Sequence, residues 1–256
     1  MSAAVPRIAR ASATVPTVEA RVPKAVVLLS GGLDSTVTAC QARADGFDVL
    51  ALTVRYGQRH DRELQAAAAV ARRIEAVDHV VSEVDLGLWG GSALTDHAIA
   101  VPLDRDEATM TREVPETYVP ARNTVLLSLA LALAEARDAD AIYFGANAVD
   151  YSGYPDCRPA FVAAFEAAAN LGTKRGVAGR PFRVVTPLIA LTKADIVHLG
   201  VKLGAPFGLT WSCYLGEERA CGRCDSCLLR LKGFREAGVR DPLPYATGPP
   251  EAPGAD

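Results

Sequence analysis

The stretch that most constrains the fold of this chain is Ser30-Gly31-Gly32-Leu33-Asp34-Ser35-Thr36, near the start of the sequence. Residues 25–29 before it form an apolar run with two adjacent valines, which predicts a buried parallel strand. Residues 36–44 after it are mainly small or apolar and predict a helix. Two glycines between a strand and a helix allow a tight turn that brings backbone N–H groups close to a ligand. We therefore expect a loop whose following helix binds an anion at its N-terminus.

The residue types in this loop indicate a phosphate site of a particular kind. Backbone amides and the hydroxyls of Ser30, Ser35 and Thr36 can hold phosphate oxygens. A P-loop would carry a lysine after its second glycine, and none is present. Asp34 would repel a phosphate directly, so we expect it to hold Mg²⁺ against one. A plain strand–turn–helix junction is the alternative, but Ser-Gly-Gly-x-Asp-Ser is far more specific than a glycine pair.

Length and composition exclude several classes of protein. The chain has 256 residues, enough for one large or two small domains, and a formal net charge of −3. A weakly acidic chain is not expected to bind nucleic acid directly. No apolar run approaches ~18 residues, so we expect no transmembrane helix and no membrane partner. Residues 1–23 lack the apolar segment of a secretory signal and are predicted to be a disordered leader, and residues 241–256 a disordered tail.

Apolar runs and helical patterns alternate along the chain, which predicts a doubly wound, Rossmann-like α/β fold. The sheet is predicted to have five parallel strands in a domain spanning 24–206. A segment at 207–240 is predicted to contain a cysteine cluster and a C-terminal helix that ends near 237. The further predicted strands are 48–55, 77–84, 139–145 and 182–186, and the further helices are 62–75, 123–137, 159–171 and 193–203.

Three of these segments carry additional expectations. The helix at 123–137 is apolar nearly all round, so we expect it to be buried centrally. Thr192 is predicted to cap the helix at 193–203 and Gly204 to end it. Residues 85–117 show no clear period, and because long loops are usually functional or mobile, this segment is a candidate lid.

Polar segments follow three of the predicted strands, at 30–36, 55–60 and 147–158. Ligands of doubly wound sheets bind beyond the carboxyl ends of the strands. We therefore expect these segments to form one shared site.

The segments after the second and fourth strands supply candidate substrate contacts. An aromatic ring, an amide, a cation and an imidazole follow the second strand, and such groups can bind a planar heterocycle or phosphates. Two tyrosines after the fourth strand can stack on a purine-like ring, and two carboxylates there can accept from its N–H groups. Cys157 is expected to be a buried, inert thiol, because no activating partner is evident. The candidates are Tyr56, Gln58, Arg59, His60, Asp150, Tyr151, Gly153, Tyr154, Asp156 and Arg158.

Two cations at predicted helix starts are candidates for binding an anionic substrate. The helix dipole favours anions at that end, so it does not explain Arg122, which precedes Asn123. We expect Arg122 to face a carboxylate or a phosphate, with Asn123 beside the substrate. Lys193 lies just inside another helix and is expected to reach an oxyanion, although a solvated lysine remains an alternative.

Four cysteines near the end of the chain have the spacing of a metal-binding site: Cys213, Cys221, Cys224 and Cys227. Four thiolates complete the tetrahedral coordination of Zn²⁺ and leave no position for water, so a structural site is predicted. An iron–sulfur cluster uses similar spacings and remains an alternative. Clustered cysteines also suit a reducing compartment better than a disulfide framework, which predicts a cytoplasmic location.

The glycine loop resembles the pyrophosphate-binding loop of the ATP pyrophosphatase superfamily, whose members have an adenine nucleotide alpha hydrolase-like fold. Together with Tyr-Gly-Gln-Arg-His, Val-Pro-Ala-Arg-Asn, Asp-Tyr-Ser-Gly-Tyr-Pro-Asp-Cys-Arg and the four cysteines, it resembles the 7-cyano-7-deazaguanine synthase family over residues 24–237. The chain departs from that family in its long leader, its Pro-rich tail, and Asn147-Ala-Val-Asp150 where some members carry Cys-Glu-Thr-Asp.

This resemblance implies an ATP-dependent ligase that converts 7-carboxy-7-deazaguanine and ammonia to the nitrile through adenylated carboxylate and amide intermediates. It implies ATP, Mg²⁺ and Zn²⁺ as cofactors, a homodimer, and a deazapurine seated by residues 150–158. Catalytic roles are assigned to Asp34, Ser35, Arg122 and Lys193. The ATP site is assigned to Leu29, Ser30, Gly31, Gly32, Leu33, Asp34, Ser35, Thr36, Val37, Thr38 and Ala39.

Other functions remain open from the sequence. A related adenylating ligase would stop at the amide or use another amine, and a tRNA-thiolating relative would need a basic face that the net charge does not support. A zinc module that binds nucleic acid is a further alternative, because the cysteine segment is locally basic. That alternative offers few aromatic stacking residues and leaves the glycine loop unexplained.

Overall fold

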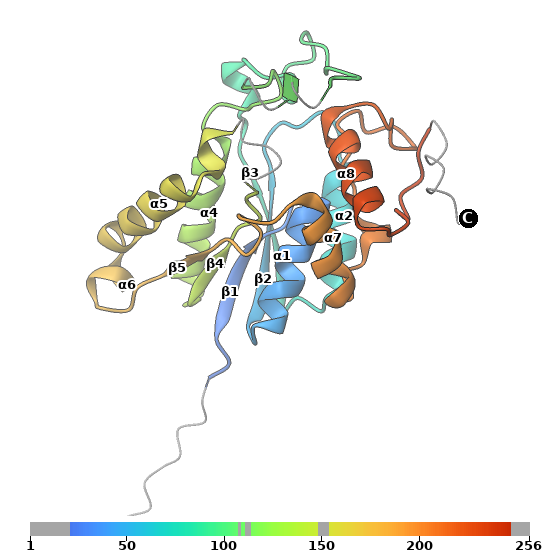
Figure 1. Cartoon of the computed structure of the whole chain (residues 1–256). Coiled ribbons are helices and arrows are strands. Elements are labelled where there is room, and N and C mark those ends of the chain that lie inside the picture. The colour runs from blue at the N-terminus through green and yellow to red at the C-terminus, as the bar shows by residue number, and fades with distance from the viewer. Residues whose placement is uncertain (1–20, 107–108, 111–113, 148–153, 247–256) are drawn as a thin grey trace, which may run out of the picture.

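Five parallel strands form one sheet among the residues that the computed structural model describes, which are 21–106, 109–110, 114–147 and 154–246. Their order is β3–β2–β1–β4–β5 (Figure 1). The order reverses beside β1, and doubly wound sheets bind ligands at such a switch point. The strands are β1 (Lys24–Leu28), β2 (Asp48–Arg55), β3 (Asp78–Glu83), β4 (Ala141–Tyr143) and β5 (Arg183–Val185).

Helices cover both faces of the sheet. On one face lie α1 (Leu33–Ala44), α2 (Arg62–Arg73) and α7 (Lys193–Lys202), and on the other α4 (Arg122–Ala136) and α5 (Pro159–Gly172) (Figure 1). Alternate residues of β1 point to opposite layers, Val26 toward α4 and Val27 toward α1. Further helices are α6 (Lys174–Val177), α8 (Asp225–Glu236) and the 3₁₀ turns η1 (Gly87–Trp89), η2 (Pro155–Cys157) and η3 (Phe207–Leu209).

The predicted doubly wound, five-stranded sheet is confirmed, with element ends that shift by a few residues. β4 spans three residues instead of the predicted 139–145, because Ala139 still donates its amide to the end of α4. Thr192 caps α7 as predicted, in a capping box with Asp195, and Gly204 follows the helix with a φ of +66°. In the described part of the chain, no helix has the length and apolarity that crossing a bilayer requires.

The expectation that the apolar helix would be buried centrally was wrong for α4. It buries only one side against the sheet, through Leu127, Ala130 and Ala134. Leu129 and Leu133, on its other sides, are only partly buried. The helix lies on an outer layer of a three-layer fold, so one face remains beyond the reach of the sheet.

The predicted disordered ends at 1–23 and 241–256 include residues that the structure describes as packed. Residues 1–20 and 247–256 lie outside the described residues, but Arg21 pairs with Asp138 and Asp140 beside the sheet. Residues 241–246 pack on the cysteine segment, where the Asp241 carboxylate binds the buried Arg230 and accepts a hydrogen bond from the Tyr245 hydroxyl. The Pro-rich composition concealed this anchoring, because it depends on an arginine 11 residues away.

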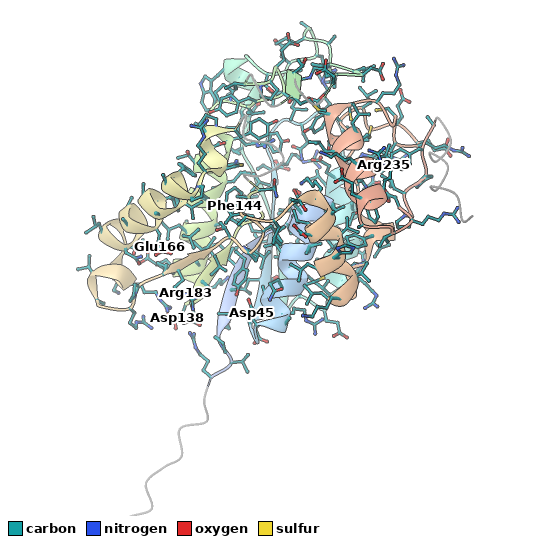
Figure 2. The ribbon with its side chains drawn as sticks, viewed as in Figure 1. Asp45, Asp138, Phe144, Glu166, Arg183 and Arg235 are labelled. Atoms are coloured by element: carbon teal, nitrogen blue, oxygen red, sulfur yellow. The ribbon has the colours of Figure 1, made fainter. Side chains whose placement is uncertain are left out.

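The sheet is oriented so that its carboxyl-terminal edge meets the cysteine segment. Figure 2 shows Phe144, just after β4, at the opposite end of the sheet from Asp45, Asp138 and Arg183, which flank the starts of strands. The cysteine segment packs against the predicted lid: Leu103 pairs with Cys224 in a β-bridge, and Arg105 forms an ion pair with the buried Asp225. The region 85–117 is thus anchored where it is described, and its role as a lid stays a prediction.

Candidate active site

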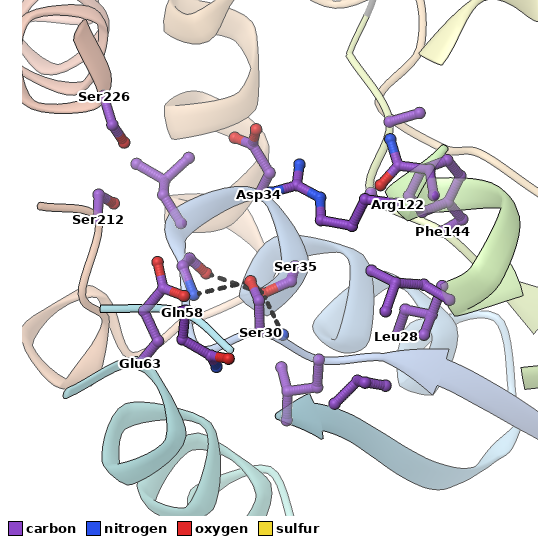
Figure 3. Close-up of a pocket in the computed structure, with 18 of the residues that line it drawn as sticks. Leu28, Ser30, Asp34, Ser35, Gln58, Glu63, Arg122, Phe144, Ser212 and Ser226 are labelled. Atoms are coloured by element: carbon purple, nitrogen blue, oxygen red, sulfur yellow. Dashed lines mark hydrogen bonds between the residues drawn. The ribbon is translucent and has the colours of Figure 1, made fainter. Parts of the chain in front are cut away.

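A cavity of about 300 Å³ opens at the carboxyl ends of β1, β2 and β4. Its floor is the glycine loop, and its walls come from α2, α4, α7 and the cysteine segment. Figure 3 shows Glu63, Ser212 and Ser226 on one side of the cavity and Arg122 and Phe144 on the other. The predicted sharing of one site by the segments after β1, β2 and β4 is confirmed for the described residues.

Hydroxyl groups of the glycine loop form hydrogen bonds within the loop. The Ser35 hydroxyl accepts a hydrogen bond from the Ser30 amide at 3.2 Å and lies 3.1 Å from the Ser30 hydroxyl (Figure 3). The Thr36 hydroxyl donates to the Gly32 carbonyl at 2.8 Å, so it is occupied within the helix. Ser30 and Ser35 therefore remain the hydroxyls that line the cavity from this loop.

Only part of the predicted ATP segment lines the cavity. Leu29, Ser30, Gly32, Leu33, Asp34 and Ser35 do so. Gly31 and Thr36 do not, and Val37, Thr38 and Ala39 are buried without lining the cavity. The prediction extended too far along α1, because a helix turns its successive residues away from the ligand at its first turn.

Gly31 is required where the loop touches α2. Its φ is +84°, and a Cβ added to it would lie 2.4 Å from the Glu63 carbonyl oxygen and 2.5 Å from the Ala67 amide. Both are backbone atoms, which cannot move aside as a side chain can. The glycine thus lets the phosphate loop and α2 approach closely.

We expect Gly31→Ala to lower the free energy of unfolding more than Gly46→Ala does. Gly46 has a similar φ of +88° but open space around its added Cβ, so its substitution carries only the left-handed strain of about 1–2 kcal/mol. The overpacking at Gly31 adds roughly 1–3 kcal/mol. Urea denaturation of the two variants measures the difference, and equal losses would contradict the close approach.

Asp34 and Lys193 form an ion pair at the mouth of the loop, with 2.5 Å between Lys193 Nζ and Asp34 Oδ2. The other carboxylate oxygen, Oδ1, is buried and has no hydrogen-bond partner among the described residues. A buried oxygen of this kind needs a donor or a cation. The donor set therefore fits a divalent cation that binds Asp34 beside the phosphate loop.

Arg122 lies between aromatic rings on the opposite wall. Its guanidinium is 5.5 Å from the centre of the Tyr56 ring and 5.9 Å from that of Tyr154, and it donates to the Tyr56 hydroxyl at 3.4 Å. Desolvation lowers the pKa of Arg122, but the surrounding tyrosine hydroxyls raise it by more, so it stays charged. No carboxylate of the described residues lies within ion-pair distance of it. Arg122 lines the cavity, and its role in binding an anionic ligand stays a prediction.

Several predicted substrate contacts lie elsewhere. Arg59 donates to the carbonyls of Ala93, Asp96 and Ile99 and so anchors the 85–117 segment, outside the cavity. His60 contacts the Cys213 carbonyl at 3.0 Å through Nε2, and Arg158 is exposed. None of these three residues lines the cavity as expected. Arg59 and His60 show that a cation or imidazole in a loop serves equally well to bind backbone carbonyls.

Of the predicted substrate contacts near η2 and the cavity, some have a structural role and others line the cavity. Asp156 is buried and accepts a hydrogen bond from the Asn123 amide at 3.1 Å, so it satisfies the start of α4 and does not line the cavity. Tyr56, Gln58, Asn123 and Tyr154 line the cavity as predicted. Asp150, Tyr151 and Gly153 lie outside the described residues.

Cys157 lines the cavity as a protonated thiol. Burial raises the pKa of Cys157 to about 12, and the Asn123 side-chain amide donates to its sulfur at 3.3 Å. A thiol with a raised pKa is a poor nucleophile. The expectation of an inert thiol agrees with this environment.

Several residues of the cavity wall were not predicted from the sequence. Glu63 belongs to α2, and Ser212, Tyr214 and Ser226 flank the cysteines. A spacing signal existed for Glu63, which stands one turn before the buried Ala66 and Ala67 on the same face of the helix. For the serines no pattern pointed inward, since their position depends on how the cysteine segment folds.

The four cysteines converge at one point. Their sulfur atoms all lie within 4.8 Å of one another, and the four residues are buried. Backbone amides of Arg223 and Cys224 each donate to the Cys221 sulfur at 3.3 Å. Tetrahedral zinc separates its sulfur ligands by about 3.8 Å, which follows from bonds of about 2.3 Å. The cluster can hold a metal ion with small adjustments.

The protonation of these thiols also favours a bound cation. Hydrogen bonds from Cys224 and Cys227 lower the pKa of Cys213, whereas donating to Cys213 raises the pKa of Cys224 to about 12 and raises the pKa of Cys227. Without a metal, Cys224 and Cys227 therefore hold their protons more tightly than ordinary cysteines, whereas Cys213 loses its proton more readily. A metal ion replaces the shared protons and allows all four sulfurs to ionise.

Comparison with known proteins identifies the family. The model of the family described as queuosine biosynthesis protein QueC matches residues 24–238. The chain belongs to the QueC family. It is 57% identical over 227 residues to the 7-cyano-7-deazaguanine synthase of Thermosynechococcus vestitus, covering 89% of this chain and 97% of that protein. It is 59% identical over 231 residues to that of Anaeromyxobacter dehalogenans, covering 90% of this chain and 98% of that one.

The region that matches the QueC family contains the whole described site. Every residue that lines the cavity, and all four clustered cysteines, lie within 24–238, whereas Asp241 and Tyr245 follow it. Among solved structures, the chain is also similar to NMN synthetase from Francisella tularensis, with 16% identity, a TM-score of 0.44 and coverage of 86% of this chain and 79% of that one. This second similarity is too low to add to the family assignment.

Proposed function

We propose that this QueC family member is an ATP-dependent ligase that converts 7-carboxy-7-deazaguanine and ammonia to 7-cyano-7-deazaguanine. The observation that carries the proposal is the similarity to curated relatives of that name, at 57% and 59% identity over nearly their full lengths. The cavity supports it, because it combines an anion-binding loop, an orphaned carboxylate oxygen and an arginine between aromatic rings.

The reaction needs activation of a poor electrophile. A carboxylate reacts with ammonia only after one of its oxygens has become part of a leaving group, and ATP supplies that group when bound. The α1 N-terminus with Ser30 and Ser35 would hold the phosphates, and Asp34 would bind Mg²⁺ through Oδ1. Lys193 would then be freed from Asp34 to face the phosphate charge.

The substrate carboxylate requires a cation, and Arg122 is suitably placed. Tyr56 and Tyr154 hold the guanidinium from two sides, so its position is set before the substrate binds. The amide formed in a first activation has an oxygen that can be activated in turn, and loss of that oxygen leaves the nitrile. Both activations would use the same loop and the same arginine.

The proposal also covers the bound metal, the cellular location and the oligomeric state. The cysteine cluster would hold Zn²⁺, since four thiolates close its coordination. Free thiols, including Cys40 in the core, favour the reducing cytoplasm. A homodimer would cover apolar side chains that α4 and α5 leave partly exposed, such as Leu171, which is 81% exposed. No direct nucleic-acid partner is proposed.

Mass spectrometry of the reaction products tests the proposal. Purified protein is incubated with 7-carboxy-7-deazaguanine, ATP, Mg²⁺ and ammonium, with omission of ATP as the control. We expect the nitrile, formed only when ATP is present. Accumulation of the amide alone would indicate a ligase that stops one dehydration earlier, and recovery of unchanged carboxylate would contradict both.

A further inference from the structure

Glu63 faces the cavity without a hydrogen-bond or ion-pair partner among the described residues. It belongs to the first turn of α2, and Figure 3 shows its side chain extending into the cavity on the side of Ser212. Among the residues that the structure describes, none donates a hydrogen bond to its carboxylate or lies at ion-pair distance from it. Carboxylates enclosed by protein are normally paired. An unpaired one in a ligand cavity therefore points to a ligand.

The position of Glu63 associates it with the reacting end of the substrate. Its backbone carbonyl oxygen lies 2.4 Å from the site of a Cβ on Gly31, so the residue starts directly beside the phosphate loop. A substrate carboxylate activated by ATP must lie next to that loop, because the two are joined through the α-phosphate. The N–H edge of a deazaguanine lies at the other end of the molecule. Glu63 is thus better placed to meet the attacking nitrogen than the base edge.

The charges around Glu63 suit a group that exchanges a proton. Burial raises the pKa of Glu63 to about 7, and the charge of Arg122 lowers it in part. A carboxyl group of this kind binds a cation in its ionised form and accepts a proton within the neutral range. Ammonia is present in neutral water almost entirely as ammonium, which must lose a proton before it can attack.

We propose that Glu63 binds ammonium in the cavity and takes a proton from it, as a catalytic residue of the amide-forming step. This inference rests on the proposed function. Ammonium gives one proton to the Glu63 carboxylate, the nitrogen lone pair forms the C–N bond, and the C–O bond to the phosphate breaks with its electrons going to AMP. The second proton that nitrogen loses goes to the phosphate oxygen of the departing AMP. The step consumes the activated carboxylate and ammonium and yields the amide, AMP and protonated Glu63.

The test compares Glu63→Gln with the unchanged enzyme in three assays. Exchange of labelled pyrophosphate into ATP, dependent on the carboxylate substrate, measures activation alone and is expected to persist. The kcat/KM for ammonium is expected to fall about a hundredfold or more, the usual contribution of a positioned proton acceptor. Trapping of the activated carboxylate by hydroxylamine, which is uncharged near neutral pH, is expected to stay near normal. Glu63→Asp should recover part of the lost ammonium use.

The control is Glu75→Gln, an exposed glutamate beyond the end of α2 that pairs with Arg43, and it should leave all three assays unchanged. Loss of pyrophosphate exchange in Glu63→Gln would overturn the proposal, because Glu63 would then serve ATP, its metal or the base. An unchanged kcat/KM for ammonium would overturn it as well. Absence of exchange in the unchanged enzyme would instead contradict the proposed function, so the two failures are distinguishable.

Discussion

Asp34→Asn is expected to lower ATP-dependent turnover at least about a hundredfold, the scale of losing one electrostatic contact to a reacting group. The asparagine keeps the shape of the side chain but removes the charge that a divalent cation needs. It also removes the charge that pairs with Lys193. The melting temperature should fall only by the loss of that ion pair, because the buried Oδ1 has no hydrogen-bond partner among the described residues. Initial rates of pyrophosphate release, measured over a range of Mg²⁺ concentrations, give the result.

Asp78→Asn is the matched control, since Asp78 starts β3 at the far end of the sheet and pairs with Arg137 on the surface. It should retain full activity. If Asp34→Asn turned over normally, the assignment of the glycine loop to the phosphates of ATP would be wrong.

The parts of the fold that could be predicted from the sequence are those governed by local pattern. The strand at 48–55 was predicted to the residue, because apolar runs between turns report buried strands directly. Thr192 and Asp195 form a capping box, which local spacing alone determines. The glycine loop was recognisable for the same reason: its function depends on residues adjacent in sequence.

The parts that could not be predicted depend on which segments meet in space. Arg59 and Arg122 look alike as cations in loops, yet one binds backbone carbonyls of 93–99 and the other faces the cavity. Asp156 was expected to bind substrate but caps α4, an element 33 residues earlier. Burial of one face of α4 rather than all of it follows from its place in an outer layer, which composition cannot reveal.

The cysteine segment also contributes directly to the wall of the cavity. Ser212 and Tyr214 flank Cys213, and Ser226 precedes Cys227, so three residues adjacent to cysteines of the cluster line the cavity. A metal that fixes the cysteines would therefore also fix one wall of the site. The cluster would act on the reaction through position, without contact with the reacting atoms.

Cys227→Ser is expected to produce the largest loss of stability among the changes considered. Four thiolates would complete the coordination of one Zn²⁺ per chain, and the remaining three would bind it much more weakly. Loss of a structural metal falls among the few single changes that exceed about 4 kcal/mol, which corresponds to about 10 °C or more in melting temperature for a chain of this size. Elemental analysis should show one zinc and almost no iron in the unchanged protein, and calorimetry measures the shift.

Cys40→Ala provides the matched control, because Cys40 is a free, buried cysteine in the core between the sheet and α1, away from the cluster. It should keep its zinc and lose only the modest stability of a smaller core side chain. In Cys227→Ser, activity should fall along with the fraction of folded protein, since Ser226 loses its anchor. Visible absorbance and bound iron would indicate an iron–sulfur cluster instead. If the unchanged protein contained no metal and Cys227→Ser melted at the same temperature, the four cysteines would not form a structural metal site, although their sulfurs lie within 4.8 Å of one another.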